Sequence, residues 1–142
     1  MDVKELRIEN YVKYNGNVVS VYAISNPTPN KDKHFDNKVR VTLWCNGLID
    51  ATIDEIESIP ITDELLEKCG FEQCGYIFKT LFIEMYEVTN GWHLHIDNER
   101  FETALSTTIK YLHQLQNAYY LLTGKELEIK LGNYIQFYTK NT

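Results

Sequence analysis

The chain has 142 residues, of which 44% are hydrophobic, 13% aromatic and 24% charged, and its formal net charge is −6. This composition is typical of a globular protein and excludes an intrinsically disordered chain, which would contain few aromatic residues. No stretch approaches the roughly 18 consecutive apolar residues of a membrane span, and the N-terminus has no basic segment followed by an apolar one. We therefore expect a cytoplasmic protein that does not contact a membrane.

Two β-hairpins are predicted in the first part of the chain. Strand-like segments flank the dipeptides Asn15-Gly16 and Asn46-Gly47, and Asn-Gly is the strongest short hairpin signal because both residues tolerate positive φ. A polar, proline-containing loop at residues 25–37 separates the two hairpins and shows no strand periodicity.

A closing segment is expected after the second hairpin. Residues 54–56 read as a single tight turn, and Ile59-Pro60-Ile61 reads as a short edge strand, because proline cannot donate to a central ladder. Residues 1–61 are therefore predicted to form a small, strongly bent antiparallel sheet or a five-stranded barrel of the Src-homology type.

Residues 62–142 are predicted to form a second, mixed half. Thr62 can cap a short helix from Asp63 to Lys68, which Gly70 ends. The segment from Tyr76 to Val88 is apolar on both sides near its middle, so we expect one long strand in the centre of a sheet. The remaining strands are predicted at residues 92–96, 100–106, 128–131 and 134–138, with the last two forming a hairpin.

One long helix is expected at about residues 107–123, because apolar residues recur there at steps of three and four. Gly124 can adopt the left-handed conformation that ends a helix. The predicted fold class is therefore α+β: a small bent antiparallel sheet or barrel, followed by an antiparallel sheet packed on one long helix. The apolar helix positions are Ile109, Leu112, Leu115, Tyr119 and Leu122.

The other face of this helix is polar but uncharged, since no charged residue occurs between Lys110 and Lys125. Exposed helix faces normally carry Lys and Glu. Either the rest of the fold covers this face and pairs its amides, or the face is a partner surface, including the seam of a homodimer. Its residues are His113, Gln116, Asn117 and Tyr120.

The negative charge gathers in residues 50–72, which contain eight acidic residues and one lysine, a net charge of −7. No direct nucleic-acid contact is expected through this stretch, because phosphate binding needs the opposite sign. The stretch would suit a basic partner protein; the alternative is a solvated acidic face that keeps the protein soluble. The candidate partner contacts in it are Asp50, Asp54, Glu55, Glu57, Asp63, Glu64 and Glu67.

The chain has more aromatic residues than a core of this size can hold. Exposed Tyr and Trp side chains commonly anchor protein interfaces, although half-buried strand tyrosines are the commoner explanation. The aromatic residues considered are Tyr11, Tyr14, Tyr22, Trp44, Tyr111, Tyr120, Tyr134 and Tyr138.

No strong catalytic motif is present: the sequence has no glycine-rich phosphate loop, no serine elbow and no H-E-x-x-H helix. We expect no cofactor, no metal and no enzymatic activity. The three cysteines are expected to be reduced. A weak alternative places the imidazoles of His93 and His95, on one face of a strand, with the thiols of Cys69 and Cys74 in a zinc or thiol site.

The chain resembles a family of short uncharacterised proteins encoded by bacterial phages, prophages and mobile elements. The resemblance is carried by KELRIENYVKYNG from Lys4 to Gly16, IDEIESIPITDELLEKCGF from Ile53 to Phe71, and IKYLHQLQNAYYLLTGKEL from Ile109 to Leu127. Its most specific piece is the H-Q-L-Q-N run of His113 to Asn117. The chain departs from the family in the loop at residues 25–37 and after Leu127.

The resemblance implies a habitat rather than an activity. Small acidic phage proteins without active sites are often inhibitors of host machinery, including anti-CRISPR proteins, and guide-RNA nucleases hold nucleic acid in basic channels. We therefore expect a non-enzymatic protein that evades host defence by binding a basic host protein such as a guide-RNA nuclease. The alternative is a structural or regulatory phage protein that acts through self-association.

Overall fold

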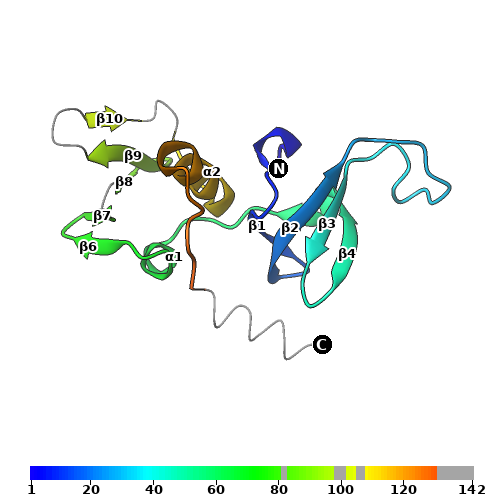
Figure 1. Ribbon diagram of the computed structural model, residues 1–142, viewed down its shortest axis with the longest axis horizontal. Coiled ribbons are helices and arrows are strands. Elements are labelled where there is room, and N and C mark those ends of the chain that lie inside the picture. Colours follow the sequence, from blue (N-terminus) through cyan, green and yellow to red (C-terminus); the bar gives the residue numbers. More distant parts are fainter. Residues whose placement is uncertain (81–82, 98–101, 105–107, 131–142) are drawn as a thin grey trace. The chain divides into compact units, whose positions relative to one another are not determined.

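The computed structural model describes residues 1–80, 83–97, 102–104 and 108–130 (Figure 1). Contacts divide the described chain into two compact units, Met1–Ile59 and Pro60–Lys130. The division predicted from the sequence lies two residues later, after Ile61. No helix in the described ranges is both long and apolar enough to cross a membrane.

The first unit is a curled five-stranded antiparallel sheet that follows a short 3₁₀ turn, η1 (Val3–Glu5). A second 3₁₀ turn, η2 (Ile53–Glu55), carries the chain from one edge of the sheet to the other, where the last strand pairs with the first. The strongly bent antiparallel sheet predicted from the sequence is confirmed. In spatial order its strands are β4 (Leu48–Thr52), β3 (Arg40–Trp44), β2 (Asn17–Ser25), β1 (Tyr11–Tyr14) and β5 (Ile56–Glu57).

Alternation along these strands separates a buried face from an outer face. Because successive side chains of a strand point to opposite sides, every second residue enters the core. On β3, Val41 and Leu43 are fully buried, whereas Thr42 is half-buried and Trp44 is exposed. The core cluster consists of Leu6, Val12, Val19, Val21, Val41, Leu43, Cys45, Ala51 and Ile56.

The closing strand differs from the expected position. Tyr14 pairs with Ile56 and Lys13 with Glu57, so the strand is β5 rather than Ile59-Pro60-Ile61. The reason is that η2 is a single turn: Glu55 caps its start by accepting a hydrogen bond from the Thr52 backbone N–H, and the backbone is extended again at Ile56, where pairing begins. Pro60 instead forms an isolated bridge inside the second unit.

In its described residues, the second unit is an antiparallel sheet with two helices, α1 (Asp63–Lys68) and α2 (Leu112–Thr123). Tyr119 and Leu122 of α2 line a cavity with Ile83 and Ile96 of the sheet, so the helix packs on one face of the sheet (Figure 1). The predicted sheet packed on one long helix is thus confirmed. In spatial order its strands are β10 (Glu102–Ala104), β9 (Gly91–Asp97), β8 (Ile83–Val88), β7 (Ile77–Lys79) and β6 (Glu72–Cys74).

The long strand predicted from Tyr76 to Val88 is two strands, β7 and β8, which pair with each other. The Thr80 N–H donates to the Ile83 carbonyl at 2.8 Å, and the Thr80 hydroxyl accepts from the Ile83 N–H at 3.3 Å. A threonine can close a turn in this way without glycine or proline, so the sequence carried no turn signal there. The expectation that this segment lies in the centre holds for β8.

The long helix begins later than predicted and ends as predicted. Ile109 exchanges backbone hydrogen bonds with Trp92, which keeps residues 108–111 extended, and α2 begins at Leu112. Gly124 ends it with a φ of 73°. The predicted last hairpin is not seen at residues 128–130, which form no strand, and its remainder lies outside the described residues.

Gly91 and Gly47 have nearly the same positive φ angle, 144° and 145°. Replacing each by alanine therefore separates the cost of a steric clash from the cost of backbone strain. A Cβ on Gly91 would lie 2.6 Å from the Ile109 carbonyl oxygen, whereas a Cβ on Gly47 meets nothing within 4 Å. We expect Gly47→Ala to cost about 1 kcal/mol and Gly91→Ala about 3 kcal/mol of unfolding free energy. Urea unfolding of each variant, followed by NMR signals of the affected unit, measures both costs. Equal losses of unfolding free energy would mean that the second unit shifts to accommodate the added methyl group.

Candidate functional site

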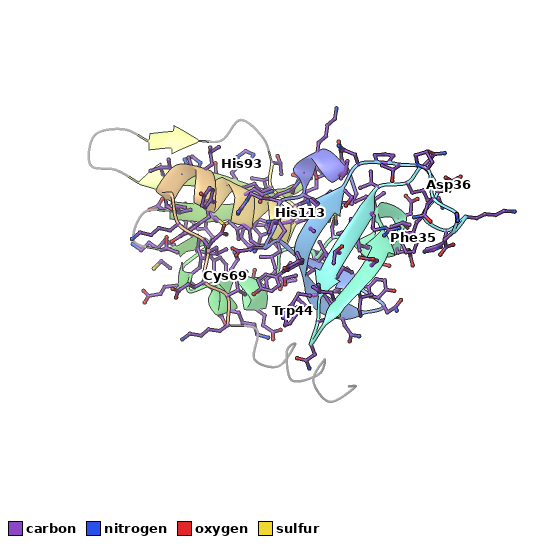
Figure 2. All side chains as sticks on the ribbon, turned by 45° about the vertical axis from the view of Figure 1, so that its right-hand side comes forward. Phe35, Asp36, Trp44, Cys69, His93 and His113 are labelled. Atoms are coloured by element: carbon purple, nitrogen blue, oxygen red, sulfur yellow. The ribbon has the colours of Figure 1, made fainter. Side chains whose placement is uncertain are left out.

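The largest exposed side chain on the first sheet is Trp44, at the end of β3 (Figure 2). It is 53% exposed and pairs across the ladder with Leu48 of β4, which is 55% exposed. Tyr22 on the adjacent strand β2, where the register shifts, is also 55% exposed. Directly opposite residues of an antiparallel pair lie on the same face, so Trp44 and Leu48 form one apolar spot, here called the Trp44–Leu48 pair.

The Trp44–Leu48 pair has a polar border on the same face. Asp50 follows Leu48 by two residues on β4 and therefore points to the same side. Its carboxylate accepts a hydrogen bond from the Thr42 hydroxyl at 2.7 Å and lies 3.6 Å from the Arg40 guanidinium. The aromatic surplus had indicated Trp44, but an isolated leucine such as Leu48 reads as a core residue in sequence.

The acidic candidates of the first unit differ in their roles. Asp54 and Glu57 are exposed on η2 and β5. Glu55 is structural: it accepts hydrogen bonds from the backbone and hydroxyl of Thr52, and its carboxylate lies 2.5 Å from His34 Nε2. The hydrogen bond from the Thr52 backbone, with a smaller contribution from His34, lowers the pKa of Glu55 below its ordinary value.

The acidic candidates of the second unit lie together on α1. Asp63, Glu64 and Glu67 are exposed, whereas Leu65 and Leu66 on the other side of the helix are buried. Glu64 pairs with Lys68 at 3.3 Å, but the Glu64 side chain is 76% exposed, so the pair contributes little stability. The acidic stretch of the sequence is therefore shared between the two units, with one group on each.

The polar face of α2 is only partly accessible. His113 and Gln116 are 0% and 2% exposed, so the expectation that they form a partner surface is corrected: they offer no surface to a partner. They adjoin Leu112 and Leu115 on a wide buried arc of the helix. Asn117 is half-buried and Tyr120 is 45% exposed. All four polar residues take part in hydrogen-bonding, ring or electrostatic interactions, and the His113 ring stacks on Tyr111.

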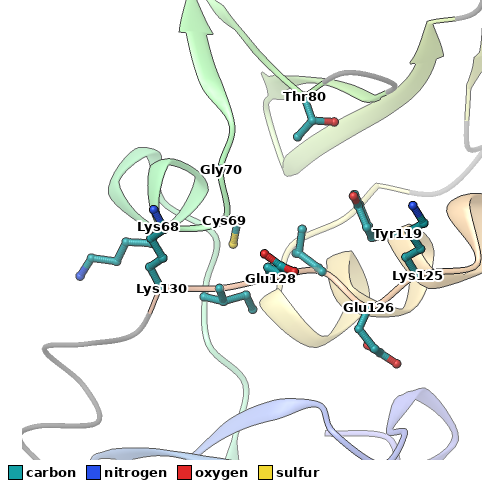
Figure 3. A pocket seen from close by; sticks show the side chains of 11 residues that line it. Lys68, Cys69, Gly70, Thr80, Tyr119, Lys125, Glu126, Glu128 and Lys130 are labelled. Carbon is teal, nitrogen blue, oxygen red and sulfur yellow. The ribbon is translucent and has the colours of Figure 1, made fainter.

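A pocket of about 830 Å³ lies within the second unit beside Cys69 (Figure 3). Its charged rim includes Lys68, Lys125, Lys130 and Glu128. Burial raises the pKa of the Cys69 thiol to about 12, so the thiol stays protonated at neutral pH. A protonated thiol is a poor nucleophile, and the pocket therefore lacks an activated cysteine.

The zinc or thiol site considered from the sequence is not assembled among the described residues. No group of three or more His, Cys, Asp or Glu side chains is placed there to hold a metal ion. His93 and His95 instead flank the hydroxyl of Tyr86, whose Oη lies 3.2 Å from His93 Nδ1 and 2.9 Å from His95 Nε2. Tyr86 was not among the residues singled out from the sequence, because its position opposite His93 depends on the register of the β8–β9 ladder.

Comparisons with protein-family models, with curated proteins and with solved structures find no significant match to this chain.

The lowered pKa of Glu55 predicts an acid-sensitive first unit. In the unfolded chain Glu55 takes up a proton near its ordinary pKa of 4.5, whereas in the folded unit it stays ionised to lower pH. The stabilisation is complete above pH 4.5 and is lost as the pH falls through the lowered pKa. We expect Glu55→Gln to cost roughly 0.5 kcal/mol at pH 7 and nothing at strongly acidic pH.

Urea unfolding at several pH values, followed by NMR signals of the first unit, measures this difference. Asp54→Asn is the matched control, because it removes an exposed carboxylate of the same turn. A pH dependence that is the same in Glu55→Gln as in the wild type would contradict the assignment.

The burial of the thiols predicts selective labelling. Cys74 is exposed, whereas Cys45 and Cys69 are buried. At pH 8, a pKa of about 12 gives Cys69 a roughly 1000-fold smaller thiolate fraction than an ordinary thiol has. We expect a thiol reagent to modify Cys74 alone in the folded protein and all three cysteines in denaturant, as read by peptide mass spectrometry. Rapid labelling of Cys69 in the folded protein would overturn this account.

Proposed function

We propose that this chain is a non-enzymatic protein-binding factor of phage or mobile-element origin. In this proposal it binds a basic host protein and thereby inhibits a nucleic-acid-targeting defence system, such as a guide-RNA nuclease. The observation that carries the binding role is the Trp44–Leu48 pair, which places more than half of two large apolar side chains in solvent. The phage habitat rests on the sequence resemblance.

The Trp44–Leu48 pair has the composition of an interface centre. Tryptophan is among the residues most enriched at positions that dominate binding energy, and such positions are usually surrounded by a polar rim. Asp50 and Thr42 supply polar neighbours on the same face. Both strands belong to a ladder, which holds the pair in a fixed geometry and lowers the entropy lost on binding.

The charge of the chain favours a basic partner. The net charge is −6, and each unit presents exposed carboxylates, with Asp54 and Glu57 on the first and the α1 group on the second. Complementary charge speeds association and selects against acidic partners, and its effect weakens with salt. A nuclease channel that holds nucleic acid is a basic surface of this kind.

Self-association is the second candidate. The uncharged face of α2 was its predicted seam, but His113 and Gln116 are buried. The Trp44–Leu48 pair is the observation that now favours it, because an exposed apolar pair on a regular sheet can bury itself against its own copy.

The binding role predicts that replacing one exposed aromatic residue weakens binding and that replacing another leaves binding unchanged. Trp44→Ala should weaken binding by about 2 kcal/mol, or roughly 30-fold, because it removes the anchor of the interface. Tyr76→Ala is the matched control: Tyr76 is 81% exposed but lies in the second unit. The measurement is inhibition of target-DNA cleavage by a purified guide-RNA nuclease as the protein is titrated in, supported by plaque counts in cells carrying that nuclease.

Charge variants test the acidic surface in the same assay. The triple variant Asp54→Lys, Glu64→Lys, Glu67→Lys should lose inhibition, and the wild type should lose it as salt rises. Glu87→Lys, on an exposed position of β8, is the control for net charge. If no nuclease is inhibited and light scattering shows a monomer, the proposal is wrong. If light scattering shows a dimer that Trp44→Ala dissociates, self-association replaces it.

A further inference from the structure

The outer face of the second sheet, the face opposite α2, carries a compact cluster of nitrogen and oxygen donors. On β8 and β9, Met85 and Leu94 are fully buried toward the helix side, so their neighbours Tyr86, His93 and His95 point the other way. Tyr86 pairs with His93 in the ladder, and His95 follows His93 by two residues. The three side chains are half-buried. We call them the Tyr86–His93–His95 cluster.

The Tyr86 hydroxyl oxygen lies at ligand-like separations from one nitrogen of each imidazole. Tyr86 Oη lies 3.2 Å from His93 Nδ1 and 2.9 Å from His95 Nε2. Zinc–nitrogen and zinc–oxygen bonds of about 2.0 to 2.2 Å place neighbouring ligands roughly 2.9 to 3.5 Å apart, for angles between octahedral and tetrahedral. The two separations from the Tyr86 oxygen fall in this range, so small side-chain movements that bring the two imidazole nitrogens toward one point would complete a three-ligand set.

The scaffold is suited to holding such a set. The donors come from two strands that pair over six residue positions, from Ile83–Ile96 to Val88–Gly91. The Tyr86 ring contacts both imidazoles, with centroid distances of 5.4 Å to His93 and 5.0 Å to His95. Ligands on paired strands with rings packed against one another are already ordered, which lowers the entropy that binding must overcome.

We propose that the Tyr86–His93–His95 cluster is a binding site for a late first-row divalent cation, Zn²⁺ or Cu²⁺. Imidazole nitrogens select these metals over Mg²⁺ and Ca²⁺, which prefer sites made of oxygen ligands. Three protein ligands leave at least one position of a four-coordinate ion for water or an exogenous donor. This site is independent of the Trp44–Leu48 pair, which lies in the other unit.

Proton positions in the cluster are consistent with metal uptake. The Tyr86 hydroxyl can donate to one imidazole and accept an N–H from the other. Binding requires both imidazoles to present a lone pair, so the donating ring must move its proton to its other nitrogen. If Tyr86 binds as phenolate, its hydroxyl proton passes to solvent, so uptake releases one proton.

The nearby charges favour a cation. Glu84 lies directly opposite His95 in the ladder and adds a negative charge beside the cluster. Lys79 of β7 pairs with Glu84 on its other side and offsets part of this charge. Imidazole lone pairs beside one carboxylate suit a divalent cation better than an anion.

The test is metal binding by the untagged full chain. Equilibrium dialysis against Zn²⁺ should give one equivalent bound with micromolar or tighter affinity, and Zn²⁺ should raise the melting temperature of the second unit. The double variant His93→Gln, His95→Gln should weaken binding at least 10-fold and abolish the thermal shift. Cu²⁺ should give a phenolate-to-copper absorption band that is absent from Tyr86→Phe.

Two matched variants separate this site from other donors. His34→Gln removes the imidazole in the exposed loop, and Cys74→Ser removes the exposed thiol, so neither should change the stoichiometry. Binding that survives the double histidine variant, or that is lost in Cys74→Ser, would overturn the proposal. Absence of Zn²⁺ binding at micromolar concentration to folded protein would also overturn it, and circular dichroism establishes that each variant is folded.

Discussion

The second unit depends on one pair of backbone hydrogen bonds, between Trp92 and Ile109. The N–H of each residue donates to the carbonyl of the other, at 2.7 Å and 2.8 Å. This bridge holds the segment before α2 extended along β9, so the helix begins at Leu112, and it brings the Ile109 carbonyl close to Gly91. Trp92 is buried, so the alternation of side chains along β9 leaves His93 and His95 on the outer face.

The fold was predictable wherever a local signal decided it. Asn15-Gly16 and Asn46-Gly47 each mark an observed hairpin, and Gly124 ends α2, because the tolerance of positive φ is a property of the residue itself. The turn at Thr80 and the late start of α2 were not predictable. Both depend on hydrogen bonds whose geometry exists only in the folded chain, and tertiary pairing overrides local periodicity there.

The residues of the candidate sites could likewise be predicted only in part. Composition identified exposed aromatic residues in general, but only the ladder pairs Trp44 with Leu48 and places Asp50 on the same face. The charge pattern located the acidic stretch, but it could not show that the Glu55 carboxylate is bonded to Thr52 and His34. A helical wheel places His113 and Gln116 on a polar face, whereas burial depends on what packs around the helix.

The division of the chain at Ile59 has a consequence for biosynthesis. Every residue of the first core, from Leu6 to Ile56, is present before the second unit has been translated. Its neighbouring strands are mostly consecutive in sequence, so little loop-closure entropy delays folding. The second sheet must wait longer, because Ile109 and α2 follow it in the chain. During that interval its apolar face, with Ile83, Met85 and Leu94, is the part of the nascent chain most exposed to aggregation.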